Sequence, residues 1–315
     1  MYIKQYNVLA KVKGNINERF LSTAQIAIRG ALGYCIMEVS KELYYYAFKP
    51  RRERFRGIML RRLSKVPKPY IITPITLTDI DTIRFGVRIL GNVIYYEEQL
   101  VNALARLEGR SLYNVQVKSV EEITCTKEIS RLTLILYDKS RGVFRSSDMS
   151  LAVTDQDIHN MAMEHLNMIR RNGKDNNSTL KLTISTLTPI LLLRDGLNIL
   201  RENKLKLSDI VAYTARRRSL IEYFYGSRRL YYTAEEVKEL MEFVDTNTMI
   251  HNIKVEEVDI RIKDKRGFCK GFIEFSFTNK DEEHIIKVIE LLILAGFIGI
   301  GKMTTFGFGQ LALSL

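Results

Sequence analysis

In the first half of the chain, the spacing of apolar residues switches between the pattern of a strand and the pattern of a helix. Residues Asn7–Val12 have the pattern of a strand, and Phe20–Leu43 places apolar residues three and four positions apart, which predicts an amphipathic helix. The patterns that follow predict strands at 69–77 and 82–90, a helix at 96–107, and strands at 113–120 and 132–137. Strand, helix, two strands, helix and strand is the element order of the ferredoxin-like fold.

The second half of the chain repeats this order. Its patterns predict a strand at 180–187, helices at 207–223 and 234–244, a hairpin of strands at 253–262 and 271–277, a helix at 282–294 and a closing strand at 311–313. The repetition predicts an α+β protein of two tandem ferredoxin-like domains. We expect the join in the polar stretch 170–179, where Gly, Asn and Asp cluster, so that the domains span residues 1–170 and 171–315.

The length and the remaining composition narrow the class of protein. At 315 residues the chain is long enough for two domains that each bury a core. No apolar run reaches the ~18 residues of a membrane span, and the first residues lack the pattern of a signal peptide, so we expect a cytoplasmic protein without membrane contact. The three cysteines and four histidines stand at spacings that fit neither a disulfide framework nor a metal site. We therefore expect no metal and no cofactor.

The chain is strongly basic, with 48 Lys and Arg residues against 36 Asp and Glu and a net charge of +12. Such a charge favours a polyanionic partner. Aromatic residues interleave with a basic segment at 49–68, and rings beside cations suit stacking on unpaired bases, although a solvated loop can have the same composition. The rings are Tyr44, Tyr45, Tyr46, Phe48 and Phe55, and the candidate RNA-binding arginines are Arg51, Arg52, Arg54 and Arg56.

Two further segments are candidates for phosphate contact. The C-terminal GIGKMTTFGFGQ lets the backbone approach a phosphate chain closely, or else forms a helix cap followed by a hairpin bulge. Its candidate residues are Gly299, Gly301, Lys302, Thr304, Thr305, Gly307 and Gly309. In TARRRSLIEYFYGSRR, consecutive arginines point about 100° apart on a helix, so at most two of them face one ligand. We take Arg216 and Arg217 as that pair, with a solvated helix face as the alternative.

These segments resemble a known family. The sequence GIGKMTTFGFGQ resembles the glycine-rich signature of the repeat-associated RAMP proteins of CRISPR systems, and most closely that of the repeat-cleaving endoribonuclease, the sixth Cas protein. Further segments are similar to blocks of that family in the same order: IRGALG at 28–33, PYIITP at 69–74, FGVRILGN at 85–92 and LTISTLTPILL at 182–192. Members of that family have two ferredoxin-like domains, as expected above for this chain.

The resemblance implies a function. It implies an enzyme that binds CRISPR repeat RNA, in the precursor and as mature crRNA, and cuts once per repeat without a metal, leaving a 2′,3′-cyclic phosphate. It also allows other Cas proteins as partners. The alternative, within the same superfamily, is a RAMP protein that binds RNA without cutting it and serves in an interference complex.

The catalytic residues are the point at which the chain departs from the family. Many members use a histidine from the first helix or its neighbouring loop, whereas this sequence has no histidine before His159. Tyr34, directly after IRGALG, and Lys41 are the nearest replacements for proton transfer, and Arg29 is placed to neutralise the phosphorane. The alternative is that Tyr34 and Lys41 are ordinary residues of that helix.

Overall fold

The computed structural model describes residues 1–51, 55, 66–172, 181–194, 197–199, 205–260, 267–278 and 281–314. Three of the candidate arginines, Arg52, Arg54 and Arg56, lie outside the described residues. Within the described ranges, no helix is long and apolar enough to cross a membrane. All three cysteines are described, and each is buried and outside any disulfide.

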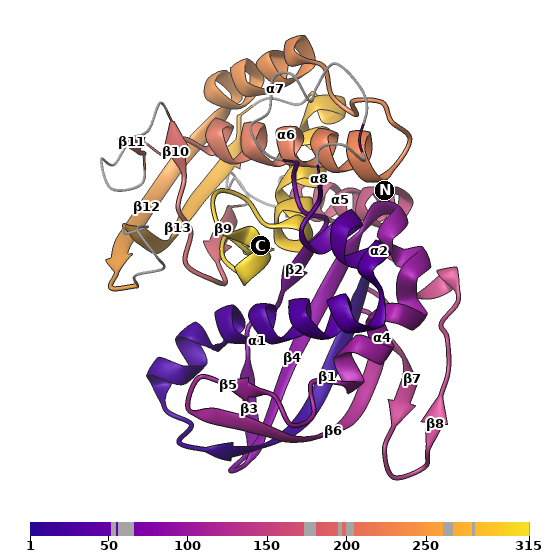
Figure 1. Cartoon of the computed structure of the whole chain (residues 1–315). Coiled ribbons are helices and arrows are strands. Elements are labelled where there is room, and N and C mark those ends of the chain that lie inside the picture. The colour runs from indigo at the N-terminus through magenta and orange to yellow at the C-terminus, as the bar shows by residue number, and fades with distance from the viewer. Residues whose placement is uncertain are drawn as a thin grey trace. The chain divides into compact units, whose positions relative to one another are not determined.

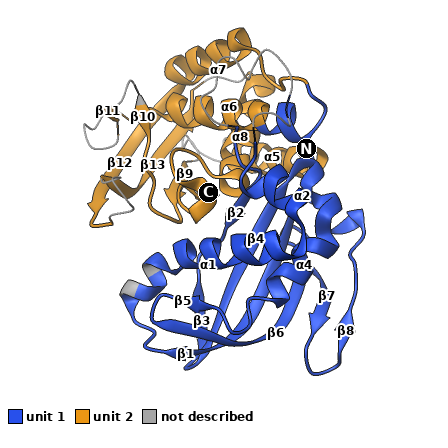
Figure 2. Ribbon diagram, in the orientation of Figure 1, with its two compact units in different colours: residues 1–154, 221–228 blue, residues 155–220, 229–315 orange. Residues whose placement is uncertain are grey.

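The chain forms two compact units, which Figure 2 shows in separate colours. The first comprises residues 1–154 and 221–228, and the second comprises residues 155–220 and 229–315. This grouping assigns residues 155–170 to the second unit, whereas the expected division lies at 170/171. The division of the chain into domains 1–170 and 171–315 stays a prediction.

An eight-stranded antiparallel sheet organises the first unit (Figure 1). Its main path runs β2-β4-β1-β6-β7-β8, while β3 pairs with β4 and β5 pairs with β6. The strands are β1 Ile3–Gly14, β2 Tyr70–Ile72, β3 Thr76–Asp79, β4 Thr82–Leu90, β5 Ser111–Leu112, β6 Val115–Lys127, β7 Leu132–Asp138 and β8 Val143–Phe144. The order β2-β4-β1-β6, with a helix after β1 and another after β4, is the ferredoxin-like arrangement predicted from the sequence.

The helices of the first unit lie between those strands. They are α1 Glu18–Val39, α2 Lys41–Leu43, the π-helical turn η1 Tyr44–Phe48, the 3₁₀ turn η3 Gly91–Tyr96, α4 Glu97–Ala105 and the 3₁₀ turn η4 Met149–Leu151. Helix α1 packs against α4, and Ala24, Ile28 and Leu32 on its inner face are fully buried. These are residues of the apolar stripe that predicted the helix.

The helix predicted over 20–43 is interrupted at Ser40. That residue is extended, with φ −151° and ψ 103°; its N–H donates to the Ile36 carbonyl oxygen, and its hydroxyl accepts from the Leu43 N–H at 3.1 Å. Ser40 therefore ends α1 and also caps α2, a role that serine performs well because its short side chain accepts from the next turn. The prediction of one continuous helix was wrong at this residue.

The second unit repeats the arrangement with a four-stranded antiparallel sheet in the order β12-β13-β9-β14. Its strands are β9 Leu182–Thr186, β12 Thr248–Val258, β13 Phe268–Phe277 and β14 Leu311–Ser314, and a separate short pair is β10 Leu193–Arg194 with β11 Leu197–Asn198. Its helices are α5 Asp155–Asn172, α6 Leu207–Tyr225, of which residues 221–225 belong to the first unit, α7 Ala234–Asn247, α8 Glu282–Ile298 and the 3₁₀ turn η5 Thr304–Phe306. Helix α6 follows the first strand of the unit and α8 follows the third, so the duplicated ferredoxin-like fold is confirmed.

Helix α5 was not predicted from the sequence. It packs against α8 and buries a narrow stripe, Ile158, Ala162 and Leu166, at intervals of four residues. Two further signals mark its ends: Asp155 and Asp157 in the first turn, and Arg170 and Arg171 in the last, charges that favour a helix dipole.

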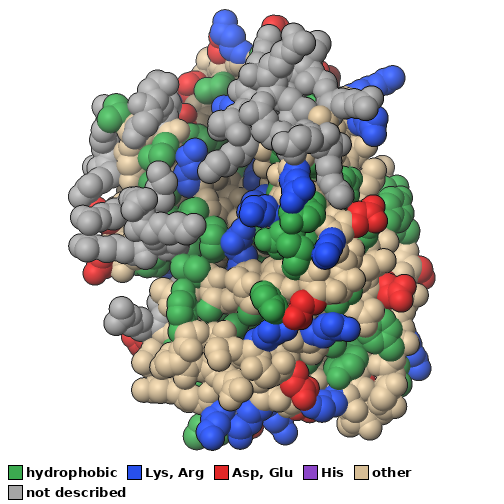
Figure 3. Space-filling view, in the orientation of Figure 1, with side chains coloured by type: hydrophobic (Ala, Val, Ile, Leu, Met, Phe, Trp, Pro, Cys, Tyr) green, Lys and Arg blue, Asp and Glu red, His purple; other side chains and the backbone are tan. Residues whose placement is uncertain are grey.

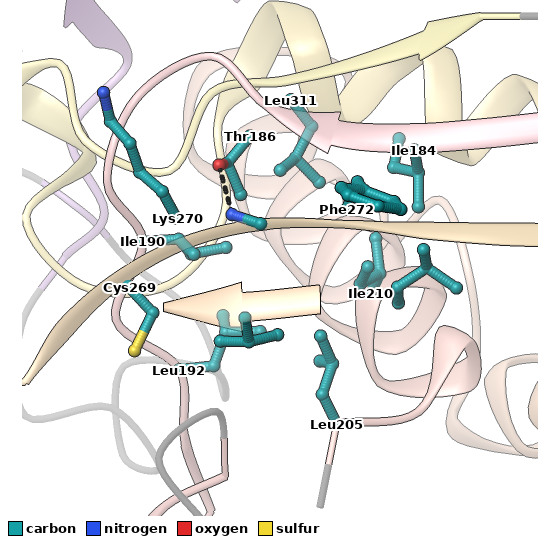
Figure 4. A pocket seen from close by; sticks show the side chains of 13 residues that line it. Ile184, Thr186, Ile190, Leu192, Leu205, Ile210, Cys269, Lys270, Phe272 and Leu311 are labelled. Atoms are coloured by element: carbon teal, nitrogen blue, oxygen red, sulfur yellow. Dashed lines mark hydrogen bonds between the residues drawn. The ribbon is translucent and has the colours of Figure 1, made fainter. Parts of the chain in front are cut away.

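A small apolar cavity lies in the core of the second unit (Figure 4). It is lined by side chains such as Ile184, Leu192 and Phe272, and the Gly271 N–H beside it donates to the Thr186 hydroxyl at 2.9 Å. Its volume of about 20 Å³ is close to the space that a single water needs. We therefore treat it as a packing defect of the core.

Candidate functional site

Tyr34 is exposed on helix α1, with 57% of its surface accessible, and a cation lies over its ring. The guanidinium carbon of Arg110 is 4.4 Å from the ring centre, and its Nη2 donates to Glu38 Oε2 at 2.6 Å. That hydrogen bond raises the pKa of Arg110 above its usual value, so the cation is permanent. Arg110 was not among the residues predicted from the sequence, although it directly follows Gly109, the glycine after helix α4.

Lys41 is exposed at the start of α2. Lys41 follows Tyr34 by seven residues, which on the continuous helix predicted over 20–43 would place the two on a similar face, but the break at Ser40 puts them on separate helices. Its neighbour Glu42 accepts a hydrogen bond from the Tyr96 hydroxyl at 2.8 Å. Lys41 is therefore accessible, but helix geometry does not place it beside Tyr34.

Arg29 has a different set of contacts. Its Nε donates to the hydroxyl of Tyr70 at 3.0 Å, and the buried Tyr70 ring stacks on Phe48 with centres 4.1 Å apart. Five residues along a helix correspond to a rotation of about 140°, so Arg29 and Tyr34 point to different sides of α1. Arg29 ties α1 to β2, and a joint catalytic role with Tyr34 stays a prediction.

The glycines of the C-terminal segment allow close approach of protein backbone. Gly299, Gly301, Gly307 and Gly309 all have positive φ, between 62° and 84°. A side chain on Gly301 would lie 2.5 Å from the Leu191 carbonyl oxygen, and one on Gly309 would lie 1.9 Å from that of Ile300. Only glycine fits these two positions without displacing backbone. The spacing of the segment is therefore required by the fold itself, whatever ligand it binds.

The same segment presents a short polar edge. The N–H of Lys302 donates to the Leu191 carbonyl oxygen at 2.9 Å, while its side chain is exposed. Within the described residues, the backbone N–H groups of Met303, Thr304 and Thr305 have no hydrogen-bond acceptor in the protein. Thr304 is buried and Thr305 is half-buried. Lys302 and these N–H groups are what the segment offers to a phosphate.

The three arginines of α6 differ in burial. Arg216 is exposed, whereas Arg217 Nε donates to the Ile298 carbonyl oxygen at 2.7 Å, and desolvation lowers the pKa of Arg217 to about 10. Arg218 is 2% exposed; its Nη2 lies 2.9 Å from Asp155 Oδ1, and its guanidinium carbon is 3.4 Å from the Tyr231 ring centre. Of the predicted pair, Arg216 is accessible and Arg217 holds the end of α8.

The aromatic residues beside the basic segment also differ in their surroundings. Phe48 is a core residue on Tyr70, and Tyr45 carries the Arg51 guanidinium 3.6 Å from its ring centre. Tyr46 and Phe55 line a pocket of the first unit that is described further below. On the face viewed in Figure 3, Lys and Arg side chains lie at several separate places, some of them beside Asp or Glu side chains.

The four histidines all lie in the second unit and have protein partners or partial burial. His159 pairs with Glu290 at 2.7 Å, His251 with Ser276 at 2.8 Å, and His284 with Asp281 at 2.8 Å. Burial lowers the pKa of His165. Among the described residues, no group of three or more His, Cys, Asp or Glu side chains is arranged to hold a metal ion.

Comparison with known proteins gives matches in both halves of the chain. Residues 184–311 match the family model described as CRISPR-associated endoribonuclease Cas6, and residues 24–149 match a model described as an N-terminal domain. No curated protein matches the chain.

Solved structures match the whole chain. A Cas6 product complex is similar over 100% of both chains, with 14% identity and a TM-score of 0.57, and a complex with a substrate mimic has 14% identity and a TM-score of 0.55 over the same extent. The Cas6 of Thermus thermophilus covers 100% of this chain and 99% of its own, with 15% identity and a TM-score of 0.53. At these identities the likeness shows the fold.

Proposed function

Since the chain is a Cas6-type RAMP protein of the CRISPR-associated endoribonucleases, we propose that it cuts CRISPR repeat RNA without a metal ion. In this reaction the 2′-hydroxyl attacks the adjacent phosphorus, the bond to the 5′ oxygen breaks, and a 2′,3′-cyclic phosphate remains on the upstream product. The observation that carries the proposal is the exposed Tyr34 hydroxyl group on the first helix, with the Arg110 cation over its ring.

The reaction needs three contributions: a base for the 2′-hydroxyl, positive charge for the phosphorane, and an acid for the departing 5′ oxygen. We assign the two proton transfers to Tyr34 and Lys41, both accessible on neighbouring helices. Arg110 supplies a fixed positive charge beside Tyr34. Arg29, whose guanidinium donates a hydrogen bond to the Tyr70 hydroxyl, supplies positive charge from the other side of α1.

We assign RNA binding to those residues of the predicted basic set that are described and exposed. These are Arg51, Arg216 and Lys302, with the N–H groups of the glycine-rich segment. Arg52, Arg54 and Arg56 are proposed to extend the contact of Arg51, and the glycines and Arg217 to hold the segment in shape. The similar structures include a Cas6 with its product and with a substrate mimic, which supports repeat RNA, precursor and mature, as the ligand.

The cellular setting follows from the same proposal. An enzyme that processes CRISPR transcripts meets its substrate in the cytoplasm, and the mature crRNA that it releases passes to other Cas proteins. Both the location and the Cas partners are part of the proposal. A RAMP protein that only binds RNA would share the fold and the basic residues, so cleavage itself must be measured.

The test is incubation of the purified full chain with end-labelled repeat RNA in EDTA. We expect one cut per repeat, and an upstream product whose 3′ end resists phosphatase until acid opens the cyclic phosphate. Cleavage that EDTA abolishes and Mg²⁺ restores would overturn the metal-independent mechanism. Tight binding without any cleavage, with or without metal, would favour the RNA-binding subunit.

A further inference from the structure

A pocket lined by aromatic side chains opens in the first unit, and the proposed cleavage reaction does not use it. Its volume of about 460 Å³ falls within the roughly 300–1,000 Å³ of ligand-binding pockets. The lining residues are Tyr46, Phe55, Asn92, Tyr223, Phe224, Tyr225, Gly226 and Arg228. All belong to the first unit, the last five through the segment 221–228.

The floor of the pocket is held rigidly. Tyr225 is 1% exposed, and its hydroxyl donates to the backbone carbonyl oxygens of Tyr46 at 3.2 Å and Pro67 at 2.9 Å. Gly91 has φ +65°, and a side chain there would lie 2.4 Å from the Tyr225 carbonyl oxygen. This close approach brings the next residue, Asn92, to the wall. These contacts fix the positions of Tyr225 and Asn92 in the pocket.

Most ring pairs around the pocket are arranged edge to face, while Tyr46 stacks on Phe55 with ring centres 6.0 Å apart and planes at 12°. Tyr46 lies 5.2 Å from Tyr225 at 69°, Phe55 lies 5.4 Å from Phe224 at 87°, and Tyr223 lies 5.1 Å from Phe224 at 81°. An edge-to-face pair covers at most one face of either ring, so a ring that makes a single such contact within the described residues, as Tyr223 does with Phe224, keeps a face for a further aromatic ring. Tyr46 also lies in the π-helical turn η1, a rare conformation that is frequent at functional sites.

The polar groups of the pocket complement a nucleotide. Arg228 is exposed, and its charge lies close enough to lower the pKa of the Tyr46 phenol, against the larger rise that burial causes. Arg228 has φ +65°, an uncommon conformation for a residue other than glycine and a cost that functional sites often carry. Asn92 offers an amide that both donates and accepts.

We propose that this pocket binds one unpaired nucleobase of the RNA, stacked on Tyr223, with the Asn92 amide at its polar edge and the neighbouring phosphate on Arg228. An apolar ligand would need neither the amide nor the cation, and a phosphate alone would not need the rings. The inference rests on the proposed function only for the identity of the polyanion as RNA. It deepens that function by adding a base-binding subsite to phosphate contacts.

The test uses a nine-residue oligouridylate in which the central base is 2-aminopurine, whose fluorescence is quenched when it stacks. The wild-type chain should quench it on binding. Tyr223→Leu keeps apolar bulk and removes the ring, so we expect most of the quenching to disappear and the affinity to fall about 10-fold, because stacking on an aromatic ring is worth roughly that much per base.

The matched control is Tyr113→Leu. Tyr113 is an exposed tyrosine of the same unit, in the turn between β5 and β6. Ile3 pairs with Leu90, next to the pocket, and Gly14 pairs with Val115, so Tyr113 lies at the opposite end of β1, roughly 30 Å away. This control should quench like the wild type. Equal quenching by Tyr223→Leu and Tyr113→Leu would overturn the proposal.

Two further measurements keep the inference testable if Tyr223→Leu is poorly folded. The same oligonucleotide with an abasic central ribose should bind the wild-type chain about 10-fold more weakly, and an unchanged affinity would exclude a base-binding pocket. Arg228→Gln should lower affinity and reduce the salt dependence by about one phosphate contact, yet still quench at saturation. Failure of the wild-type chain to cut repeat RNA would count against the proposed function only, because quenching does not depend on cleavage.

Discussion

Helices α1 and α6 hold equivalent positions in the two units, since each follows the first strand of a ferredoxin-like sheet. Their polar residues differ in exposure to solvent. Tyr34 of α1 is 57% exposed beneath Arg110, whereas Arg218 of α6 is 2% exposed between Asp155 and Tyr231. The duplicated fold therefore does not duplicate the site. Helix α1 presents Tyr34 to solvent, whereas α6 uses Arg217 and Arg218 to hold neighbouring elements.

The difference has a structural cause in the second unit. Helix α5, which has no counterpart in the order strand, helix, two strands, helix, strand, supplies Asp155 to Arg218, and the end of α8 supplies the Ile298 carbonyl oxygen to Arg217. In the first unit, α1 packs its apolar stripe on the sheet and on α4, and its outer face carries Tyr34. A charged residue on α6 is therefore a weaker candidate for ligand contact than one on α1, with Arg216 as the accessible exception.

The largest effect is expected from Arg218→Ala. Removal of one partner from a buried ion pair typically costs 3–5 kcal/mol, and Asp155 is partly exposed, so we expect the free energy of unfolding to fall by about 3 kcal/mol. Urea denaturation measures it. Arg216→Ala is the matched control, which should change stability by less than about 0.5 kcal/mol. Equal stability of the two variants would show that the burial of Arg218 does not hold the unit together.

The next effect concerns the exposed helix. Tyr34→Phe and Lys41→Ala should each slow single-turnover cleavage by roughly 10² with little change in RNA affinity, because general acid–base catalysis contributes at least that much. Tyr34→Phe retains the ring under Arg110, so the cation stays in place. Tyr95→Phe, at another exposed tyrosine, serves as the control. Wild-type rates in both variants would leave α1 with a structural role alone.

Lys302→Ala should weaken binding of repeat RNA by about 1–3 kcal/mol while the cleavage rate at saturation stays near the wild-type value. The lysine is exposed on the glycine-rich segment, whose backbone is fixed by hydrogen bonds to residues such as Leu191. Lys270→Ala removes an exposed lysine from the same unit and is the control. Equal losses for the two lysines would mean that the segment adds only general charge.

The smallest effect is expected for Arg51→Ala. Each phosphate contact to a single strand contributes about 0.7 to the slope of log affinity against log salt, so the slope should decrease by about that amount. A filter-binding titration at several salt concentrations measures it. An unchanged slope would show that Arg51 serves only its contact with the Tyr45 ring.

Much of the fold could be predicted because its strands and helices have regular apolar spacing. Strand β4 has the predicted bounds, and α6, α7 and α8 begin at the predicted residues. Helix α5 was missed because its buried stripe, Ile158, Ala162 and Leu166, is narrow and lies among polar residues. The acidic first turn and basic last turn are the signals that could have found it.

The candidate site could be predicted less well, since it depends on contacts between residues far apart in the sequence. Arg110 meets Tyr34 across 76 positions, and Asp155 covers Arg218 across 63. Local sequence does not encode such contacts. The four glycines of the glycine-rich segment have positive φ, and Gly301 and Gly309 pack closely against the protein's own carbonyl groups, while phosphate contact by the segment stays a prediction.

The central claim is that the RNA's own 2′-hydroxyl is the attacking group. The most direct measurement is single-turnover cleavage, in EDTA, of a repeat RNA whose nucleotide 5′ of the scissile phosphate carries 2′-deoxyribose. We predict that this RNA binds with nearly unchanged affinity and is not cut, while the all-ribose RNA is cut at one site. Cleavage of the deoxy-substituted RNA at the rate of the unmodified RNA would contradict the account.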